Sequence, residues 1–183
     1  MKLKFTCFLP LLLILSFPSL VFAKERIRTL DGVVIKISDG DTIQLNSGGT
    51  KLRIRLFGID APETEKRNKR TGNISKTGQP YGNEAGKALR DKIMGQKVKI
   101  DVMDIDKYKR LVSLVWLGNR NINQEMVHDG YAWAYRKYLD RVYASEFIAF
   151  EERARAKRLG LWQEYNPQPP WEFRKIQRQY NNP

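Results

Sequence analysis

The sequence predicts an α+β protein that is mainly β: a five-stranded Greek-key barrel of the OB type carrying three helices. Two observations predict this fold. Five short segments alternate apolar and polar residues in the manner of strands. A helical pattern separates the third segment from the fourth, and two more helical patterns follow the fifth. Short strands in this order are typical of a small closed barrel, although pattern alone leaves an α+β sandwich open.

The strands are placed by alternation, by β-branched residues and by the turns between them. They are expected at Arg26–Ile37, Thr42–Leu45, Lys51–Phe57, Val98–Val102 and Leu111–Leu117. A turn at Ser38-Asp39-Gly40 ends the first strand, and the glycine-rich residues 46–49 form a hairpin turn before the third. In the third strand Arg53 and Arg55 share one face, because side chains alternate along a strand. We expect the other face to lie in the core.

The helices are placed by apolar residues at helical spacing and by the glycines that end them. They are expected at Glu84–Met94, Ile122–His128 and Ser145–Arg158. Residues 64–80 are polar and basic without apolar periodicity, which indicates a mobile basic loop. Residues 164–183 contain Pro167, Pro169 and Pro170 and are expected to form an extended C-terminal tail. The folded domain is therefore expected to span residues 24–163.

The N-terminus has the pattern of an export signal. Lys2 and Lys4 precede an apolar stretch that ends at Val21-Phe22-Ala23, a small-residue cleavage pattern, so residues 1–23 are expected to be removed. Two prolines interrupt the stretch, and it is shorter than the roughly 18 apolar residues of a membrane anchor. We expect a secreted or periplasmic, bacterial protein without an anchor. Cys7, the only cysteine, lies in the signal, so no disulfide is expected in the mature chain.

The charge balance indicates an anionic partner. The formal net charge is +13, and loss of residues 1–23 removes two lysines and no acidic residue, leaving 160 residues with +11. Such a surplus attracts polyanions. Nucleic acid, teichoic acid, lipopolysaccharide and acidic membrane all meet this description, and composition does not choose among them.

Elimination narrows the chemistry. With one histidine, His128, mechanisms that need two are excluded, and without cysteine or a histidine cluster a zinc site is not expected. Ser75-Lys76-Thr77 lacks the glycine pattern of a phosphate-binding P-loop. Any metal ion should therefore be a hard cation bound by oxygen.

Carboxylates gather at two strand ends, in Asp39-Gly40-Asp41-Thr42 and in Asp60-Ala61-Pro62-Glu63. If these loops meet, Asp41 and Asp60 with a backbone carbonyl could hold a calcium ion, and Glu63 could act as a base for water. Taken alone, Asp-Gly-Asp is more often an ordinary turn. Arg55, close in sequence to three carboxylates, and Arg110 supply the cations that a phosphoryl transition state requires.

From about Val33 to Trp162 the sequence closely resembles the staphylococcal nuclease (thermonuclease) family. The two carboxylate motifs and Arg55-Leu56 carry the resemblance, together with Tyr81-Gly82-Asn83-Glu84-Ala85, Asp106-Lys107-Tyr108-Lys109-Arg110 and Ala156-Lys157-Arg158-Leu159-Gly160-Leu161-Trp162. The chain departs from the family at Lys109, where glycine is usual, and in the longer basic loop before Tyr81.

The resemblance implies one Ca²⁺ ion held by Asp41, Asp60 and the carbonyl of Ala61. It further implies that Glu63 activates or orients water and that Arg55 and Arg110 grip the phosphate. Lys107 and Tyr108 would contact a terminal phosphate, and Tyr135 or Tyr138 would stack on a base. The expected enzyme is a monomeric endonuclease that cleaves DNA and RNA with little sequence specificity and leaves 3′-phosphates. A non-catalytic nucleic-acid-binding barrel and an envelope protein that binds anionic polymers are the alternatives.

Overall fold

The computed structural model describes residues 26–139 and 141–181. The barrel elements are β1 (Arg28–Asp39), β2 (Thr42–Ser47), β3 (Thr50–Leu56), β7 (Lys97–Ile105) and β8 (Leu111–Leu117). The shorter strands are β4 (Ile59–Asp60), β5 (Lys66–Arg67), β6 (Ile74–Lys76), β9 (Arg120–Asn121) and β10 (Trp133–Ala134). The α-helices are α1 (Gly82–Ile93), α2 (Ile122–His128), α3 (Arg141–Ala156) and α4 (Pro170–Asn181), and Arg136–Tyr138 and Gly160–Gln163 form 3₁₀ turns.

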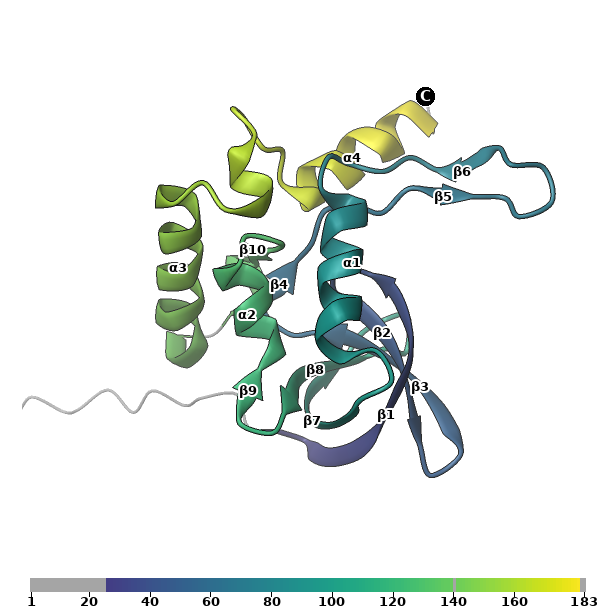
Figure 1. Ribbon diagram of the computed structural model, residues 1–183, viewed down its shortest axis with the longest axis vertical. Coiled ribbons are helices and arrows are strands. Elements are labelled where there is room, and N and C mark those ends of the chain that lie inside the picture. The colour runs from purple at the N-terminus through teal and green to yellow at the C-terminus, as the bar shows by residue number, and fades with distance from the viewer. Residues whose placement is uncertain (1–25, 140, 182–183) are drawn as a thin grey trace, which may run out of the picture.

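Five strands close a barrel, as the sequence predicts. They lie in the order β3-β2-β1-β7-β8, all antiparallel, and a parallel pairing of β3 with β8 closes the circle (Figure 1). Strand β1 is long enough to serve two neighbours, because residues 28–33 pair with β7 and residues 33–39 with β2. Register shifts after Val34 and Ile37 bend β1 into the curve that closure requires. The α+β, OB-type expectation is confirmed.

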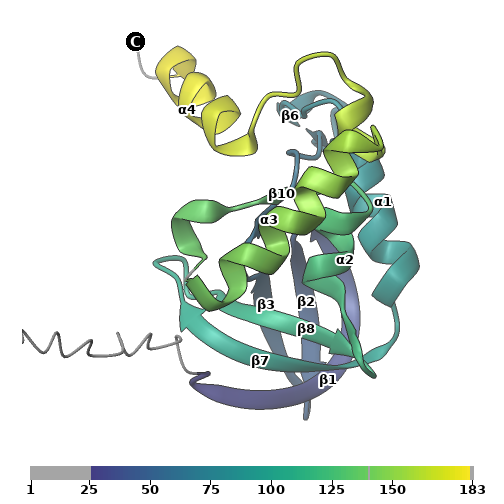
Figure 2. The same cartoon turned by 90° about the vertical axis from the view of Figure 1, so that its left-hand side faces the viewer.

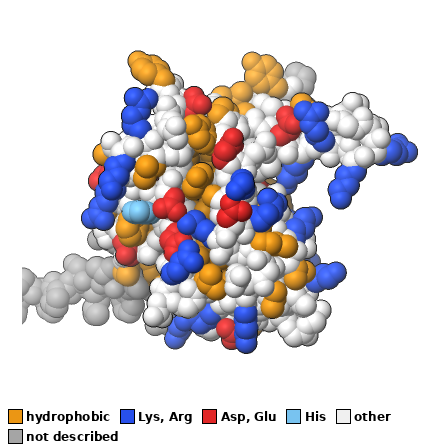
Figure 3. Space-filling view, in the orientation of Figure 1, with side chains coloured by type: hydrophobic (Ala, Val, Ile, Leu, Met, Phe, Trp, Pro, Cys, Tyr) orange, Lys and Arg blue, Asp and Glu red, His pale blue; other side chains and the backbone are white. Residues whose placement is uncertain are grey.

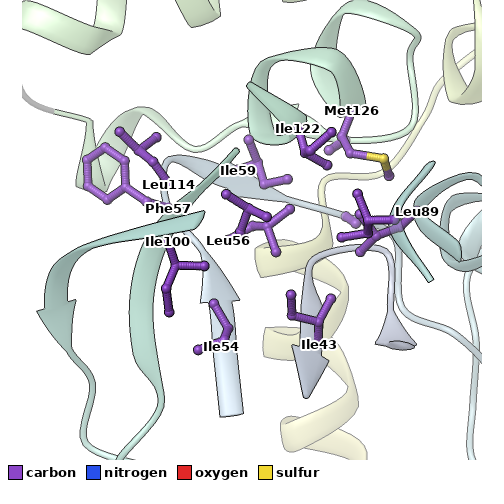
Figure 4. Close-up of a cluster of buried hydrophobic side chains, with 14 of the residues drawn as sticks. Ile43, Ile54, Leu56, Phe57, Ile59, Leu89, Ile100, Leu114, Ile122 and Met126 are labelled. Atoms are coloured by element: carbon purple, nitrogen blue, oxygen red, sulfur yellow. The ribbon is translucent and has the colours of Figure 1, made fainter. Parts of the chain in front are cut away.

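The core fills the barrel and extends under the helices. Ile54 and Leu56 of β3 are buried while Arg53 beside them is exposed, which is the alternation the sequence predicts. Apolar side chains from the barrel strands meet Leu89 of α1 and Met126 of α2 in one cluster (Figure 4). Helix α1 packs against β1, and α2 packs between β8 and α3 (Figure 2). The helices therefore cover one end of the barrel and fix the loops there.

The helix count differs from the prediction, because the described residues form four α-helices and not three. The segment predicted to be an extended tail contains α4. Pro170 is its first residue, where proline is favoured because the missing N–H would be unpaired anyway, and Glu172 lies in its first turn. The prolines at 167, 169 and 170 therefore mark the start of a helix as well as the extended connection before it.

The predicted basic loop contains a two-stranded ribbon. Strands β5 and β6 pair antiparallel, with Lys66 opposite Lys76 and Arg67 opposite Ile74, and the ribbon projects from the body of the molecule (Figure 1). Its tip is closed by Asn68, whose side chain accepts the N–H groups of Arg70 and Thr71. Two- and three-residue strands have too few residues for periodicity to reveal them.

The predicted signal peptide, residues 1–23, lies outside the described residues. Within the part of the chain that the structure describes, no helix is both long and apolar enough to cross a membrane.

Candidate active site

Asp41 is placed by the tight turn between β1 and β2. The Asp41 carbonyl accepts the Leu56 N–H at 2.8 Å, and its carboxylate accepts the Ala61 N–H at 2.9 Å and the Thr42 hydroxyl at 2.9 Å. Gly40 is required at this turn, since a Cβ there would lie 2.7 Å from the Cβ atoms of both Ala61 and Ala85. The Asp-Gly-Asp motif is therefore a turn, and the turn aims the Asp41 carboxylate at the second carboxylate motif.

Asp60 is placed by the short pairing of β4 with β10, in which it lies opposite Trp133. A hydrogen bond ties β10 to α3: the buried side chain of Glu151 in α3 accepts the N–H of Ala134 in β10 at 2.8 Å. The side chain of Asp60 is completely buried. A chain of contacts from α3 through β10 thus fixes the position of Asp60.

Glu63 is held through its backbone. Its N–H donates to the Gln79 side chain at 3.1 Å, and its carbonyl accepts the Gln79 N–H at 2.8 Å. Gly82, the first residue of α1, passes so close that a Cβ there would lie 2.1 Å from the Glu63 carbonyl oxygen. Glu63 is consequently fixed between the end of the basic ribbon and the start of α1.

Arg55 brings the two aspartates together. One guanidinium nitrogen donates to Asp41 Oδ1 and the other to Asp60 Oδ1, so both carboxylates converge on a single cationic group. Burial would raise the pKa of Asp41, but Arg55 and neighbouring hydrogen bonds lower it below the usual value. For Asp60 burial prevails over Arg55 and Arg174, and the pKa is raised. The pKa of Arg55 is raised by the two aspartates despite burial, so this guanidinium stays charged.

Asp39 adds a third buried carboxyl group beside this pair. Its Oδ1 atom has no hydrogen-bond partner, and burial together with the neighbouring Asp41 raises its pKa to about 7. Lys66 of the ribbon lies 3.9 Å from its other oxygen. The site thus gathers three carboxyl groups around Arg55, and the raised pKa of Asp39 leaves that group partly protonated near pH 7.

Two further cations complete the cluster, and sequence reasoning missed both. Lys76 of β6 donates to Glu63 Oε2. Arg174 of α4 donates to Asp60 Oδ1 and Oδ2, at 3.1 and 2.6 Å, and to Glu63 Oε1 at 2.9 Å. These bonds lower the pKa of Glu63 although burial alone would raise it, so Glu63 is held ionised. The only sequence signals were the basic composition of the two segments, since the contacts span 13 and more than 110 residues.

The cluster forms one wall of a cleft of about 1190 Å³. Residues of the ribbon and of α4 also line it, and the loop between β7 and β8 contributes Lys107, Tyr108 and Arg110. Arg110 is oriented by Asp106, which accepts its Nε at 2.7 Å and its backbone N–H at 3.0 Å. Arg55, Glu63 and Arg110 therefore line one cleft, while Asp41, Asp60 and Ala61 lie behind its surface.

The two candidate stacking tyrosines have different surroundings. Tyr135 is stacked against Trp171 of α4, with ring centres 5.1 Å apart and planes within 2°, and Tyr138 meets it edge-on at 4.8 Å. Tyr138 is 58% exposed and lines the cleft. Of the two, Tyr138 therefore has the ring that is more available to a base.

The donor set suits a hard cation. The described residues contain no cluster of three or more histidine, cysteine or acidic side chains arranged to hold a metal. Two buried carboxylates nevertheless converge where Arg55 now bridges them, and Asp39 keeps a buried oxygen without a partner. An ion such as Ca²⁺ accepts carboxylate, carbonyl and water oxygens together, and the carboxylates of Asp41 and Asp60 are oxygen donors of this kind if water and substrate supply the remaining ligands.

An OB-type barrel with a cationic cleft, lined by the ionised Glu63 and by fixed arginines with two buried aspartates behind them, defines a class: a protein whose site is built for a nucleic-acid phosphodiester. Comparison with known proteins agrees. Residues 53–164 match the model of the family described as staphylococcal nuclease homologue. The chain is 34% identical over 160 residues to a micrococcal nuclease of Shigella flexneri, an alignment covering 82% of this chain and 84% of that protein.

Two further relatives are similar over comparable lengths. Protein ParB of Escherichia coli is 37% identical over 165 residues, with 85% of each chain covered. An uncharacterized endonuclease of Haemophilus influenzae is 36% identical over 144 residues, covering 78% of this chain and 71% of its own. The chain belongs to the staphylococcal nuclease family. It is a hydrolytic nuclease, and its substrate is nucleic acid.

Proposed function

We propose that the protein is an exported, calcium-dependent endonuclease that cleaves DNA and RNA with little sequence specificity and leaves 3′-phosphate ends. The observation that carries the proposal is the convergence of Asp41, Asp60 and Glu63 with Arg55 at the wall of a basic cleft. One Ca²⁺ ion held by Asp41, Asp60 and the Ala61 carbonyl would polarise a phosphoryl oxygen and offset its developing charge.

The side chains of the cleft have distinct parts in the proposed reaction. Glu63, held ionised, accepts a proton from the attacking water or orients it. Arg55 and Arg110 donate hydrogen bonds to the phosphate oxygens as charge accumulates on them. Lys107 and Tyr108 contact a neighbouring phosphate. The water oxygen bonds to phosphorus opposite the 5′ oxygen, and the bond from phosphorus to that oxygen breaks. The 5′ oxygen takes a proton from solvent and leaves as a hydroxyl group, and the phosphate stays on the 3′ side.

Weak sequence preference follows from the same groups. Guanidinium and ammonium groups read the phosphate backbone, which is alike in every sequence. The exposed ring of Tyr138 can stack on any base of an unpaired strand. Single-stranded or frayed DNA and RNA are therefore the expected substrates. Export by residues 1–23 and action as a monomer complete the proposal.

The proposal is tested by digesting DNA and RNA with the purified chain, with calcium and with excess chelator, and measuring acid-soluble nucleotides. We expect activity only with calcium. Glu63→Gln, Arg55→Ala and Arg110→Ala should each lower kcat by about 10²- to 10⁴-fold, since each removes a proton acceptor or a transition-state donor. Product ends should accept a 3′ label only after phosphatase treatment.

The matched control is Arg53→Ala, because Arg53 lies on the same strand and face as Arg55 but is exposed and outside the cleft lining. It should retain activity. Full cleavage in excess chelator would refute the calcium role, and products that can be labelled at once would refute the 3′-phosphate assignment.

A further inference from the structure

Helix α4 places a third arginine in the active site. The Nη1 atom of Arg174 donates to Asp60 Oδ1 and also to Glu63 Oε1, and its Nη2 atom donates to Asp60 Oδ2. Arg55 and Lys76 donate to the same two residues. Every carboxylate oxygen of Asp60 and Glu63 therefore accepts a hydrogen bond from a cationic side chain. These are the residues assigned above to the cation and to the attacking water.

Arg174 also stands between solvent and the buried aspartates. The side chains of Asp41 and Asp60 are 3% and 0% exposed and do not line the cleft, whereas Arg174 is 29% exposed and does. Arg55 and Arg174, which bind these aspartates, line the cleft together with Glu63, so a divalent ion that enters from the cleft must pass cationic groups. Placing this ion against Asp60 would bring the cation close to the positively charged guanidinium of Arg174. Two positive charges repel strongly in a site of low dielectric, so this arrangement is costly.

The docking of α4 depends on few contacts. Trp171 packs on Trp133 and Tyr135, Arg174 binds the carboxylates, and Gln79 donates to the Gln168 carbonyl just before the helix. Helix α4 leads away from the barrel toward the C-terminus (Figures 1 and 2), and beyond Arg174 the side chains of Gln177 and Arg178 still line the cleft, although Arg178 and Tyr180 are exposed. A helix anchored mainly through its first turns can detach without unfolding the domain.

We propose that α4 is a detachable cover of the active site and that its Arg174 competes with the divalent cation for Asp60 and Glu63. The inference rests on the proposed function. Docking of α4 and binding of the cation then oppose each other. Linkage requires the effect to be reciprocal, so that the cation loosens α4 by the same factor by which α4 weakens the cation.

Calcium binding to the full chain, measured by titration calorimetry without substrate, tests the competition. Arg174→Ala should bind calcium about 10-fold more tightly than wild type, within the roughly 5- to 150-fold range typical of coupled sites. Arg174→Lys, which keeps the charge but loses the two-pronged geometry, should fall between them. Trp171→Ala, which weakens docking and leaves Arg174 intact, should also tighten binding.

The control is Lys175→Ala, which removes the same charge from the adjacent position of α4. Lys175 does not line the cleft, so the calcium affinity should equal that of wild type. Equal affinities in wild type and Arg174→Ala would overturn the cover and leave the calcium role intact. If wild type and all variants fail to bind calcium without substrate, the competition is overturned, while the calcium dependence of cleavage is decided separately by the chelator experiment above.

Hydrogen exchange in the wild-type chain supplies a second readout that needs no substitution. Released α4 is a 12-residue helix, which is marginal in water on its own. Amide protection over residues 170–181 should therefore fall on addition of calcium, while α1 stays protected. Unchanged or increased protection of α4 in saturating calcium would contradict detachment.

Discussion

The turn that presents Arg110 contains a lysine in a backbone conformation that favours glycine. Lys109 has a φ of 58°, in the left-handed region. Asp106 holds the turn around it, accepting the N–H groups of Tyr108 and Arg110 and, through its carbonyl, the N–H of Lys109. Position 109, where the family usually has glycine, thus has a backbone conformation that favours glycine. Lys109 adopts this strained conformation because the hydrogen bonds of Asp106 fix the turn.

Replacement of this lysine should stabilise the protein. The left-handed conformation costs a residue with a side chain about 1–2 kcal/mol. Glycine avoids this cost, but its greater freedom in the unfolded chain offsets part of the gain. We expect Lys109→Gly to raise the free energy of unfolding by about 0.5–1 kcal/mol, seen as a higher urea midpoint with an unchanged slope. Lys107→Gly, in the same turn but without positive φ, should lower it. A less stable Lys109→Gly would show that the turn carries no such strain.

At the scale of elements, the barrel could be predicted and the two sides of the cleft could not. Strands of six or more residues alternate visibly, and they were placed within a few residues of their observed ends. The ribbon β5–β6 has strands of two and three residues, and β4 pairs with β10 over two residues. Such pairings are set by tertiary contacts, because too few residues remain to show a period. Helix α4 was not predicted, because the prolines at 167, 169 and 170 indicated an extended segment.

The site divides in the same way. Asp41, Arg55, Asp60 and Glu63 lie within 23 residues at neighbouring strand ends, so their convergence followed from the sequence. Lys76 and Arg174 reach the same carboxylates from the ribbon and from α4, and no local pattern marks them among 33 basic residues. Which lysine or arginine neutralises a buried carboxylate is decided by how the elements pack.

The ribbon carries charge beyond the cleft. Lys69 and Arg70 lie at its exposed tip, outside the cleft lining, and basic side chains are visible on the projecting arm (Figure 3). Lys69→Ala/Arg70→Ala should raise KM for nucleic acid and leave kcat unchanged, because these residues would hold phosphates distant from the bond that breaks. For each phosphate that the variant no longer neutralises, the slope of log kcat/KM against log salt concentration should become shallower by about 0.7–0.9.

The comparison for this double variant is Arg153→Ala/Lys157→Ala, which removes two exposed charges at the end of α3. Both residues lie outside the cleft lining. Equal KM values and equal salt slopes in the two double variants would mean that the ribbon contributes only to the general field of the protein.

At the scale of the whole molecule, ion pairs outside the cleft join the helices that cover the barrel. Lys92 of α1 donates to Glu125 of α2 at 3.0 Å and to Asp129 at 2.7 Å. Arg120 also binds Glu125, and His128 contacts Asp129 at 2.9 Å. The bond from Arg120, followed by that from Lys92, lowers the pKa of Glu125. Burial would raise the pKa of Asp129, but Lys92 and His128 lower it.

Stability should therefore depend on pH through this cluster. Because both carboxyl groups have a lower pKa in the folded chain than in the unfolded chain, the unfolded state binds more protons at pH values between the lowered pKa and the ordinary value of 4.5 for Glu125 or 3.8 for Asp129. The stabilisation is fully present above the ordinary values and is lost as pH falls below them and through the lower pKa values of the folded chain. Urea unfolding from about pH 6 to about pH 3 should show a larger loss for wild type than for Lys92→Met, which lacks the shared partner. Lys87→Met removes an exposed pair with Asp91 on the same helix, which solvent screens, and should keep the wild-type profile. Parallel profiles for wild type and Lys92→Met would show that Lys92 does not set the acid sensitivity of the fold.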